Sequence, residues 1–303
     1  MDKNTIIGFV LIALVLFGFA WWQQPSTEEL EQQRIELKKD SIANAKKAQK
    51  AKKLATQKAN KQVETAEDST GLFHTALKGL AQEITLRNNK VELTFNTKGG
   101  IVKKAVIKNY VGHNLSVKDG SKDVNDVTLF SGDDQNLNFM LPTKEDNIET
   151  QNLYFLPSNV SDSTLTLTAA DGKGKTITLN YKLEKDYLLK LDVRTSGMAG
   201  LFKPGENQLL VEWNDKCRQQ ERGFTFENRY ATLTYKKKEG STDYLSETAE
   251  KEETTEEALD WVAFKNQFFS AVIMSKDGFA KGAKLKSIPQ EKGSQYLKQY
   301  HAN

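Results

Sequence analysis

The uncharged run Ile6–Trp22 constrains this chain more than any other segment, because it must lie in a membrane, in a protein core or in a removable leader. It reads IIGFVLIALVLFGFAWW, and no other part of the chain is apolar enough to surround it in a core. As a helix it would extend about 25 Å, close to the shortest length that crosses a bilayer. Its two closing tryptophans favour the boundary between membrane and water.

A secretory leader that is cut away is the alternative interpretation. Such a leader has a shorter apolar core followed by two small residues around the cleavage site. Gly18-Phe19-Ala20 fits this requirement loosely, and Trp21 would be a poor first residue of a mature chain. We therefore predict an uncleaved transmembrane anchor over residues 1–22. Because the chain has no second long apolar run, we expect it to cross the membrane once.

Residues 23–79 are rich in lysine, glutamine and alanine, a composition that favours helix but cannot bury a core. We predict a helical or disordered polar tether. The alternative is a basic arm, since the positive residues gather between Arg34 and Lys61 and could touch anionic lipid or a partner. A short, imperfect apolar stripe argues against a coiled-coil adaptor. The stripe consists of Leu30, Ile35, Leu37 and Ile42.

From about Leu80, apolar and polar residues alternate, which indicates strands with one buried face. We expect tight hairpins at Asn88-Asn89, where asparagine tolerates positive φ, and at Asp171-Gly172. Gly99-Gly100 predicts a turn or bulge that needs a permissive backbone. No helical periods separate the strands, which argues against a doubly wound parallel sheet. Residues 80–303 are therefore predicted to form a mainly β domain, an antiparallel sandwich.

Several further residues are expected in the interior or at an interface. The acidic segment Ser241–Asp260 is predicted to be a loop with at most a helical turn. Cys217 is predicted to be a small residue in the core or at a strand end. The phenylalanines of GFTFEN, Phe224 and Phe226, are expected in the core. Four aromatic residues are predicted to lie in the core or at an interface: Trp213, Trp261, Phe268 and Phe269.

The sequence holds no motif that is specific for catalysis, a cofactor or a metal. With a single cysteine, the chain can form neither an intrachain disulfide nor a thiolate metal cluster. His74, His113 and His301 are far apart in the sequence, and neither a phosphate-binding glycine loop nor a nucleophile elbow occurs. We predict no catalytic, cofactor-binding or metal-binding residue and no enzyme activity. The net charge of +3 is too small to indicate nucleic acid binding.

Several segments, taken in order, resemble one protein family. They are the anchor ending in Trp21-Trp22, the lysine-rich tether, FNTKGGIVKKAVIKNY at Phe95–Tyr110, and WVAFKNQFFSAVIM at Trp261–Met274. In these segments the chain is similar to the periplasmic domain and anchor of bacterial YidC, and the arrangement looks like a YidC from the Bacteroidetes. The resemblance covers essentially the whole chain.

The resemblance implies a membrane protein insertase of the bacterial inner membrane, working alone or with the Sec translocon on nascent membrane proteins. It implies that residues 80–303 form a periplasmic β-supersandwich similar to mutarotase-like sandwiches. In the family, insertion is attributed to a later bundle of membrane helices, and no such helices occur in this chain. We therefore expect a piece of a longer protein, truncated near the C-terminal end of the β domain, which anchors that domain and presents it to partners.

The residues alone leave the orientation in the membrane open. Asp2 offsets Lys3 before the anchor, and the basic arm lies on the other side of it, where the positive-inside rule would favour the cytoplasm. The resemblance implies the opposite arrangement, with the β domain in the periplasm, and we follow it. The alternative function is a membrane-anchored carbohydrate-binding or carbohydrate-processing sandwich, which would need a cleft with exposed aromatic side chains and a carboxylate pair.

Overall fold

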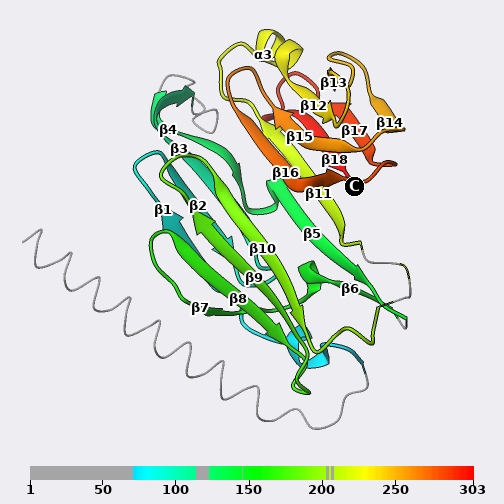
Figure 1. Ribbon diagram of the computed structural model, residues 1–303. Coiled ribbons are helices and arrows are strands. Elements are labelled where there is room, and N and C mark those ends of the chain that lie inside the picture. The colour runs from blue at the N-terminus through cyan, green and yellow to red at the C-terminus, as the bar shows by residue number, and fades with distance from the viewer. Residues whose placement is uncertain (1–70, 114–122, 145, 203–204, 206–207) are drawn as a thin grey trace, which may run out of the picture. The chain divides into compact units, whose positions relative to one another are not determined.

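The computed structural model describes residues 71–113, 123–144, 146–202, 205 and 208–303 (Figure 1). The described residues belong to one compact unit, Gln62–Asn303. The predicted anchor and most of the predicted tether lie outside them. Within the described ranges no helix is both long enough and apolar enough to span a bilayer.

Four antiparallel sheets form the domain (Figure 1). Sheet I has the order β1-β2-β3-β4, with β1 Glu83–Arg87, β2 Val91–Asn96, β3 Ile101–His113 and β4 Asp123–Ser131. Sheet II has the order β10-β9-β8-β7, with β7 Leu156–Ser158, β8 Thr164–Ala170, β9 Thr176–Leu183 and β10 Leu189–Ser196.

The other two sheets hold the C-terminal strands. Sheet III has the order β14-β17-β18-β11-β5-β6, with β5 Gln135–Pro142, β6 Asn147–Glu149, β11 Leu210–Arg218, β14 Lys251–Thr254, β17 Lys284–Pro289 and β18 Tyr296–Ala302. Sheet IV has the order β13-β12-β15-β16, with β12 Thr232–Lys237, β13 Thr242–Tyr244, β15 Leu259–Lys265 and β16 Ser270–Phe279. The described helices are α3 Phe224–Tyr230 and the short turns η1 His74–Leu77, η2 Gly132–Asp134 and η3 Thr150–Asn152.

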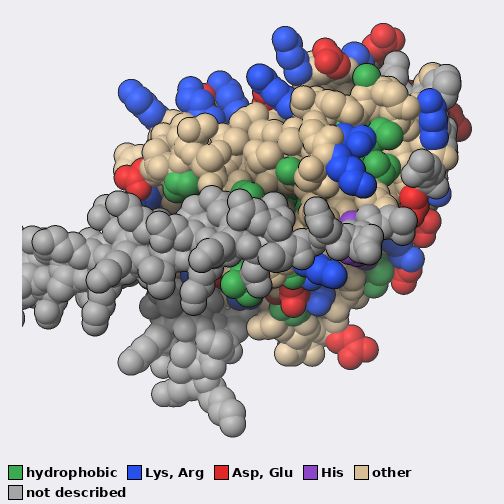
Figure 2. Space-filling view, turned by 90° about the horizontal axis from the view of Figure 1, so that it is seen from below, with side chains coloured by type: hydrophobic (Ala, Val, Ile, Leu, Met, Phe, Trp, Pro, Cys, Tyr) green, Lys and Arg blue, Asp and Glu red, His purple; other side chains and the backbone are tan. Residues whose placement is uncertain are grey.

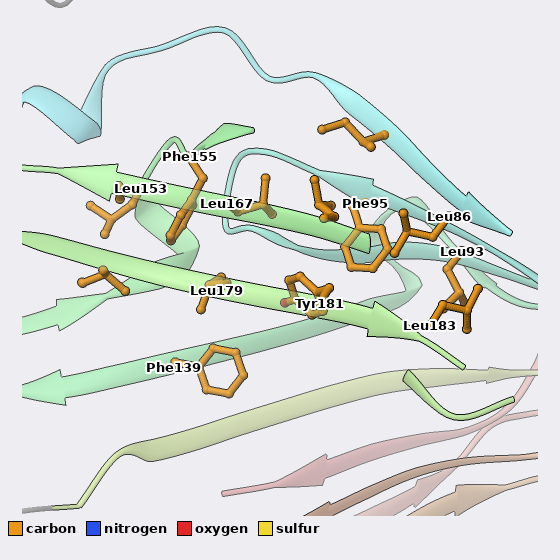
Figure 3. Packing of buried hydrophobic residues seen from close by; sticks show 14 of the residues in the cluster. Leu86, Leu93, Phe95, Phe139, Leu153, Phe155, Leu167, Leu179, Tyr181 and Leu183 are labelled. Carbon is orange, nitrogen blue, oxygen red and sulfur yellow. The ribbon is translucent and has the colours of Figure 1, made fainter. Parts of the chain in front are cut away.

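Sheets I and II face each other across the first core, which we call the N-terminal core (Figure 3). The alternation of the sequence places every second residue of their strands there, as in β8 and β9, where buried and partly exposed residues alternate. Phe95 of β2 meets Tyr181 of β9 with ring centroids 4.7 Å apart. The buried face of each sheet is thus covered by the other.

Sheets III and IV enclose a second core, the C-terminal core. Trp213 of β11 stacks on Phe264 of β15 at 3.8 Å between ring centroids, and Phe264 lies 5.1 Å from the ring of Tyr300 on β18. Strand β5 links the two cores, because its Phe139 and Leu141 belong to the N-terminal core while Leu137 packs against both. The antiparallel β architecture predicted from the alternation is confirmed, with two sandwiches joined through sheet III.

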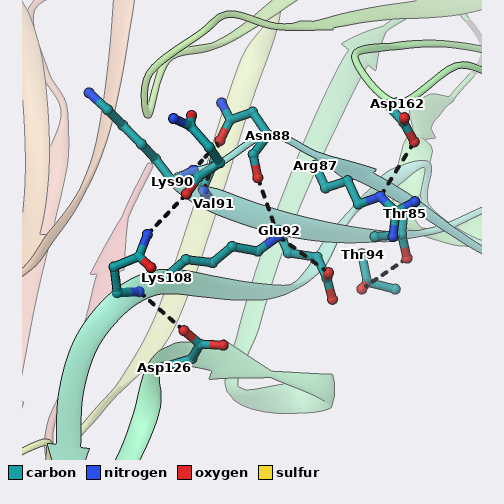
Figure 4. Close-up of polar contacts among 12 residues, drawn as sticks. Thr85, Arg87, Asn88, Lys90, Val91, Glu92, Thr94, Lys108, Asp126 and Asp162 are labelled. Atoms are coloured by element: carbon teal, nitrogen blue, oxygen red, sulfur yellow. Dashed lines mark hydrogen bonds and ion pairs between the residues drawn. The ribbon is translucent and has the colours of Figure 1, made fainter. Parts of the chain in front are cut away.

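The turn between β1 and β2 forms where predicted, but not for the predicted reason (Figure 4). The described non-glycine residues with positive φ are Phe73, Asn109 and Asn159, so Asn88 and Asn89 do not use the left-handed region. Instead, the Asn88 side-chain oxygen accepts hydrogen bonds from the backbone N–H groups of Lys90 and Val91, each at 2.8 Å. The side chain, rather than a special φ, closes the hairpin.

Gly99 and Gly100 form the predicted permissive turn, with φ of 80° and 70°. Gly100 has to be glycine for two reasons: its positive φ and the lack of space for a side chain. A Cβ there would lie 2.7 Å from Leu179 Cδ1 and 3.1 Å from Phe155 Cδ2, and the Gly100 carbonyl accepts a hydrogen bond of 2.8 Å from the Tyr181 hydroxyl. The turn is therefore packed directly against sheet II.

The acidic segment Ser241–Asp260 is not only a loop, and that prediction was wrong. It contains β13 and also β14, which pairs with β17 at the edge of sheet III. An edge strand is solvated on one side and tolerates charged residues, so its sequence shows no apolar alternation. The end of the predicted tether also packs on the domain, since Phe73 and Ala76 are buried in the N-terminal core.

Candidate functional site

A hollow of about 440 Å³ lies where the end of β3, the segment before α3 and the β15–β16 turn meet. Its lining combines apolar side chains with one cation and one carboxylate. The side chains that line it belong to Val111, Glu221, Arg222, Phe226, Gln267 and Phe268, and Gly112 and Gly223 complete the lining. Small-molecule and peptide sites are concave and mostly apolar with a few polar groups, so this hollow is the candidate functional site.

Asn266 shapes the β15–β16 turn that carries Phe268. Its buried side-chain oxygen accepts hydrogen bonds from the backbone N–H groups of Phe268 at 3.0 Å and Phe269 at 2.8 Å, and its own N–H donates to the Phe269 carbonyl at 3.0 Å. The turn sends the two neighbouring rings in different directions. Phe269 packs against the N-terminal core and meets Tyr110 edge-on at 5.5 Å, whereas Phe268 is 65% exposed.

Glu227 fixes the segment before α3. Its carboxylate is buried and accepts hydrogen bonds from the backbone N–H of Gln220, 3.0 Å from each oxygen, and from that of Glu221 at 2.9 Å. Burial raises the pKa of Glu227 to about 7, although these backbone hydrogen bonds act in the opposite direction. The Gln220 side-chain amide also donates to the Thr128 carbonyl on β4 at 2.8 Å. The wall of the hollow is thus held to both sandwiches.

The rim presents aromatic surface to solvent. Phe226 is 57% exposed, and its ring lies 5.1 Å from that of Tyr230 on the same helix. Together with Phe268 and Val111, these side chains offer apolar area that a partner could bury, and full burial of one phenylalanine contributes about 1.5–3 kcal/mol. Chemically, the hollow can hold an apolar side chain beside groups that form hydrogen bonds and ion pairs.

A second polar cluster lies inside the domain, at sheet III. The Asp134 carboxylate accepts hydrogen bonds from Arg218 Nε at 2.5 Å and from the Tyr296 hydroxyl at 2.6 Å. Burial, with a contribution from nearby Asp134, raises the pKa of Asp215 to about 8. Burial likewise raises the pKa of the Cys217 thiol well above its usual value, which suits a packed residue rather than a reactive one. These groups connect η2, β11 and β18, and none of them lines the hollow.

The aromatic residues singled out from the sequence have separate fates. Trp213 is buried as predicted, stacked on Phe264, and Phe224 and Phe269 pack against the cores. Phe226 and Phe268 are exposed, so the core assignment of Phe226 was wrong. Trp261 is half-buried on the outer face of sheet IV. The exposure of Phe226 follows from α3, a helix of seven residues that no apolar period in the sequence indicated.

The alternative carbohydrate function required a carboxylate pair beside exposed aromatics. Of the residues lining the hollow, Glu221 is the carboxylate, while Asp134 and Asp215 are buried elsewhere. Across the described ranges, no group of three or more histidine, cysteine, aspartate and glutamate side chains is placed to hold a metal ion.

The sequence profile of a family described as the YidC periplasmic domain matches residues 83–303. Curated relatives called membrane protein insertase YidC match over nearly the whole chain. One from Phocaeicola vulgatus is 43% identical over 100% of this chain and 47% of its own length. One from Bacteroides fragilis is 39% identical over 100% and 47%, and one from Porphyromonas gingivalis is 34% identical over 98% and 47%. The chain thus spans about half the length of these relatives.

The solved structures that match this chain share much less sequence identity with it. A galactose mutarotase-like protein from Lactobacillus casei is 13% identical, with a TM-score of 0.38 over 73% of this chain and 87% of that one. A GalM/aldose epimerase homologue from C. elegans is 11% identical, with a TM-score of 0.31 over 73% and 89%.

Proposed function

Because the chain belongs to the YidC family, we propose that it is the anchoring and periplasmic part of a membrane protein insertase of the bacterial inner membrane. The whole protein would insert and fold nascent membrane proteins, alone or with the Sec translocon. The observation that carries this proposal is the match of residues 83–303 to the periplasmic domain of the family, together with 43% identity to an insertase over the full chain.

We propose three parts for the chain: a transmembrane anchor at residues 1–22, a polar tether at 23–79 and a periplasmic β domain at 80–303. The anchor and most of the tether lie outside the described residues. The burial of Phe73 and Ala76 suggests to us that the tether joins the folded domain before residue 79. In this proposal the chain crosses the membrane once and performs no covalent chemistry.

We propose further that the hollow beside Phe226 and Phe268 is where the domain contacts nascent chains or Sec components. Support comes from two exposed aromatic rings: Phe268 lies on a turn closed by hydrogen bonds to Asn266, and Phe226 lies on α3, which Glu227 joins to the preceding segment. Aromatic residues that are exposed yet rigidly placed contribute strongly to protein interfaces, because little side-chain entropy is lost on binding. Glu221 and Arg222 at the same rim would form hydrogen bonds or ion pairs that fix the orientation of the bound partner.

The test uses the longer protein in cells depleted of their own insertase. The wild-type protein is expected to restore insertion of test membrane proteins, and a photo-crosslinking amino acid at Phe268 should capture nascent chains or Sec components. The double variant Phe226→Asp, Phe268→Asp should lower both the crosslinks and the rate of insertion. Val160→Asp is the matched control, because Val160 is also an exposed apolar residue but lies before β8, away from the hollow.

Two results would count against the proposal. If the longer protein fails to restore insertion although it reaches the membrane, the insertase function is wrong. If insertion is restored but position 268 captures no protein and the double variant behaves like Val160→Asp, the hollow is not the contact site. The wild-type result distinguishes the two failures, because insertion is not restored in the first case and is restored in the second.

A further inference from the structure

The outer face of sheet IV differs in composition from the outer faces of the other three sheets. Sheets I, II and III carry charges of both signs on the side away from the cores. These are Glu83, Arg87 and Glu92 on sheet I, Lys190, Asp192 and Arg194 on sheet II, and Glu212, Lys216 and Lys286 on sheet III. The face shown in Figure 2 has the same mixture of basic and acidic side chains around scattered apolar ones.

On sheet IV the strand register brings apolar side chains into two neighbouring rows. In one row, Tyr244 of β13 lies opposite Thr234 of β12, then Ala263 of β15 and Val272 of β16. The side chains of Val262 and Phe264 on the same strand belong to the C-terminal core, so Ala263 must point outward, but it is only 5% exposed and the middle of this row is therefore covered. Tyr244 is 55% exposed and Val272 49% exposed, so this row ends in uncovered apolar groups on both edge strands.

The second row consists of Lys236 of β12, Trp261 of β15 and Met274 of β16. Met274 is 62% exposed, and the indole of Trp261 is half-buried. The two rows together form a surface that we call the outer apolar face: Tyr244, Trp261, Val272 and Met274. Nothing in the described ranges pairs with the free edge of β16, and an exposed apolar face of this kind marks an interaction surface.

The charges of the same face have one sign. Lys236 and Lys265 occupy outward register positions on β12 and β15, and no carboxylate does so in the regular part of the ladder. Asp260 and Asp277 lie at its irregular end, where the register shifts between Leu259 and Trp261. The Lys236 amine donates to the backbone carbonyls of Lys237, at 2.9 Å, and Gly240, so its alkyl stem lies along the sheet while its charge stays at the rim.

We infer that the outer apolar face rests on an anionic bilayer surface. Tryptophan and tyrosine with flanking lysines are the side chains that favour the membrane–water boundary, and the absence of outward carboxylates fits negatively charged headgroups. A flat sheet face also fits a flat surface, whereas a partner helix would need a groove. In a chain tethered to the membrane, this contact would hold the domain at the bilayer and aim the hollow beside Phe268 along the membrane surface.

Tryptophan fluorescence of the full chain in vesicles tests this inference. The vesicles contain phosphatidylethanolamine and phosphatidylglycerol with a spin label on the headgroup, which quenches only nearby rings. Trp21→Phe and Trp22→Phe remove the emission of the predicted anchor and leave Trp213 and Trp261. Because Trp213 is buried against Phe264, we expect quenching to come from Trp261 and to be lost in Trp261→Phe.

The charges are tested with matched variants in the same background. Lys236→Glu with Lys265→Glu should remove most of the quenching, as should replacement of phosphatidylglycerol by phosphatidylcholine or a high salt concentration. Lys190→Glu on sheet II reverses an exposed charge away from this face and should leave quenching unchanged. Circular dichroism establishes that each variant is folded.

Absence of quenching in the folded wild-type chain would overturn the inference. So would quenching that persists in Trp261→Phe, because another part of the chain would then be at the bilayer. If the Trp261 emission changes only when a translocon or client protein is added, the outer apolar face is a protein interface and the lipid assignment is rejected.

Discussion

The N-terminal core consists almost wholly of aliphatic side chains and phenylalanine, whereas the interior of the C-terminal sandwich also encloses Asp215, Glu227 and Lys298. In the first, the one polar group of Tyr181 is satisfied by the Gly100 carbonyl. In the second, Lys298 Nζ donates to the Glu247 carbonyl at 2.7 Å, and burial lowers its pKa. The two sandwiches therefore differ chiefly in the charged groups that they bury, because the polar side chains buried beside the N-terminal core, such as Asn138 and Thr150, are mostly neutral and hydrogen-bonded to one another.

The largest expected effect is a cavity in the N-terminal core. Phe95 is fully buried against Tyr181, and Phe95→Ala should lower the free energy of unfolding by about 3–5 kcal/mol, because apolar contacts are lost and the cavity collapses only in part. Denaturant unfolding measures this. Phe226→Ala, the same change at an exposed site, should cost less than about 0.5 kcal/mol. Equal losses for the two variants would show that the N-terminal core is loosely packed.

Gly100 provides a second test of that core. Gly100→Ala should cost about 1–3 kcal/mol for overpacking against Leu179 and Phe155, in addition to the cost of a positive φ. Gly132→Ala is the control, because Gly132 has a φ of 66° but open space around a Cβ, so that only about 1–2 kcal/mol is expected. Thermal unfolding of both variants separates sterics from backbone strain. A Gly132→Ala loss as large as that of Gly100→Ala would remove the steric argument.

The pH dependence of stability should come from the C-terminal sandwich. The pKa of Asp215 is raised to about 8 and that of Glu227 to about 7 in the folded state. In the unfolded state both carboxyl groups lose their proton at a pH of about 4. Between these pH values the folded state therefore binds more protons than the unfolded state. Stability should therefore fall as the pH rises through these values, by at most about 1.4 kcal/mol per pH unit for each group. Denaturant midpoints between mildly acidic and mildly alkaline pH measure the slope.

The variant Asp215→Asn sharpens this prediction. Asp215 lies opposite Gln135 in the register of β5 and β11, and the Asp215 Oδ1 and Gln135 Oε1 atoms both lack a hydrogen-bond partner. An amide can donate a hydrogen bond there at any pH, as a protonated carboxyl can at low pH. The variant should flatten the pH slope. A slope identical to that of the wild type would assign the effect to other groups.

The smallest effects are expected at two asparagine turns, one in each sandwich. Asn88 accepts from two backbone N–H groups and also donates to the carbonyls of Glu184 and Asp186, whereas Asn266 accepts from two N–H groups. Replacement by alanine should cost about 1–2 kcal/mol, with the larger loss at Asn88 because it makes more hydrogen bonds. Hydrogen exchange of the neighbouring amides locates each loss. A larger loss at Asn266 would indicate that burial of the polar group outweighs the number of bonds.

How much could be read from the sequence differs between the two sandwiches for physical reasons. Alternation revealed β1, β2, β8 and β9, because each has one face in an apolar core. It did not reveal β14, whose KEET sequence is that of a solvated edge, or α3, which is too short for a helical period. The hollow was not predicted either. It is formed by segments far apart in the chain, and the exposure of Phe268 depends on a turn whose geometry one asparagine sets.

Strand β5 has a mechanical consequence. It contributes Phe139 and Leu141 to one core and is hydrogen-bonded to β11, whose Trp213 lies in the other. Bending the two halves against each other would have to slide or break this shared ladder, so we expect the domain to transmit force as a stiff strut rather than to flex like a jointed arm. A pull that reaches it at Phe73 would then reorient the whole domain in one movement.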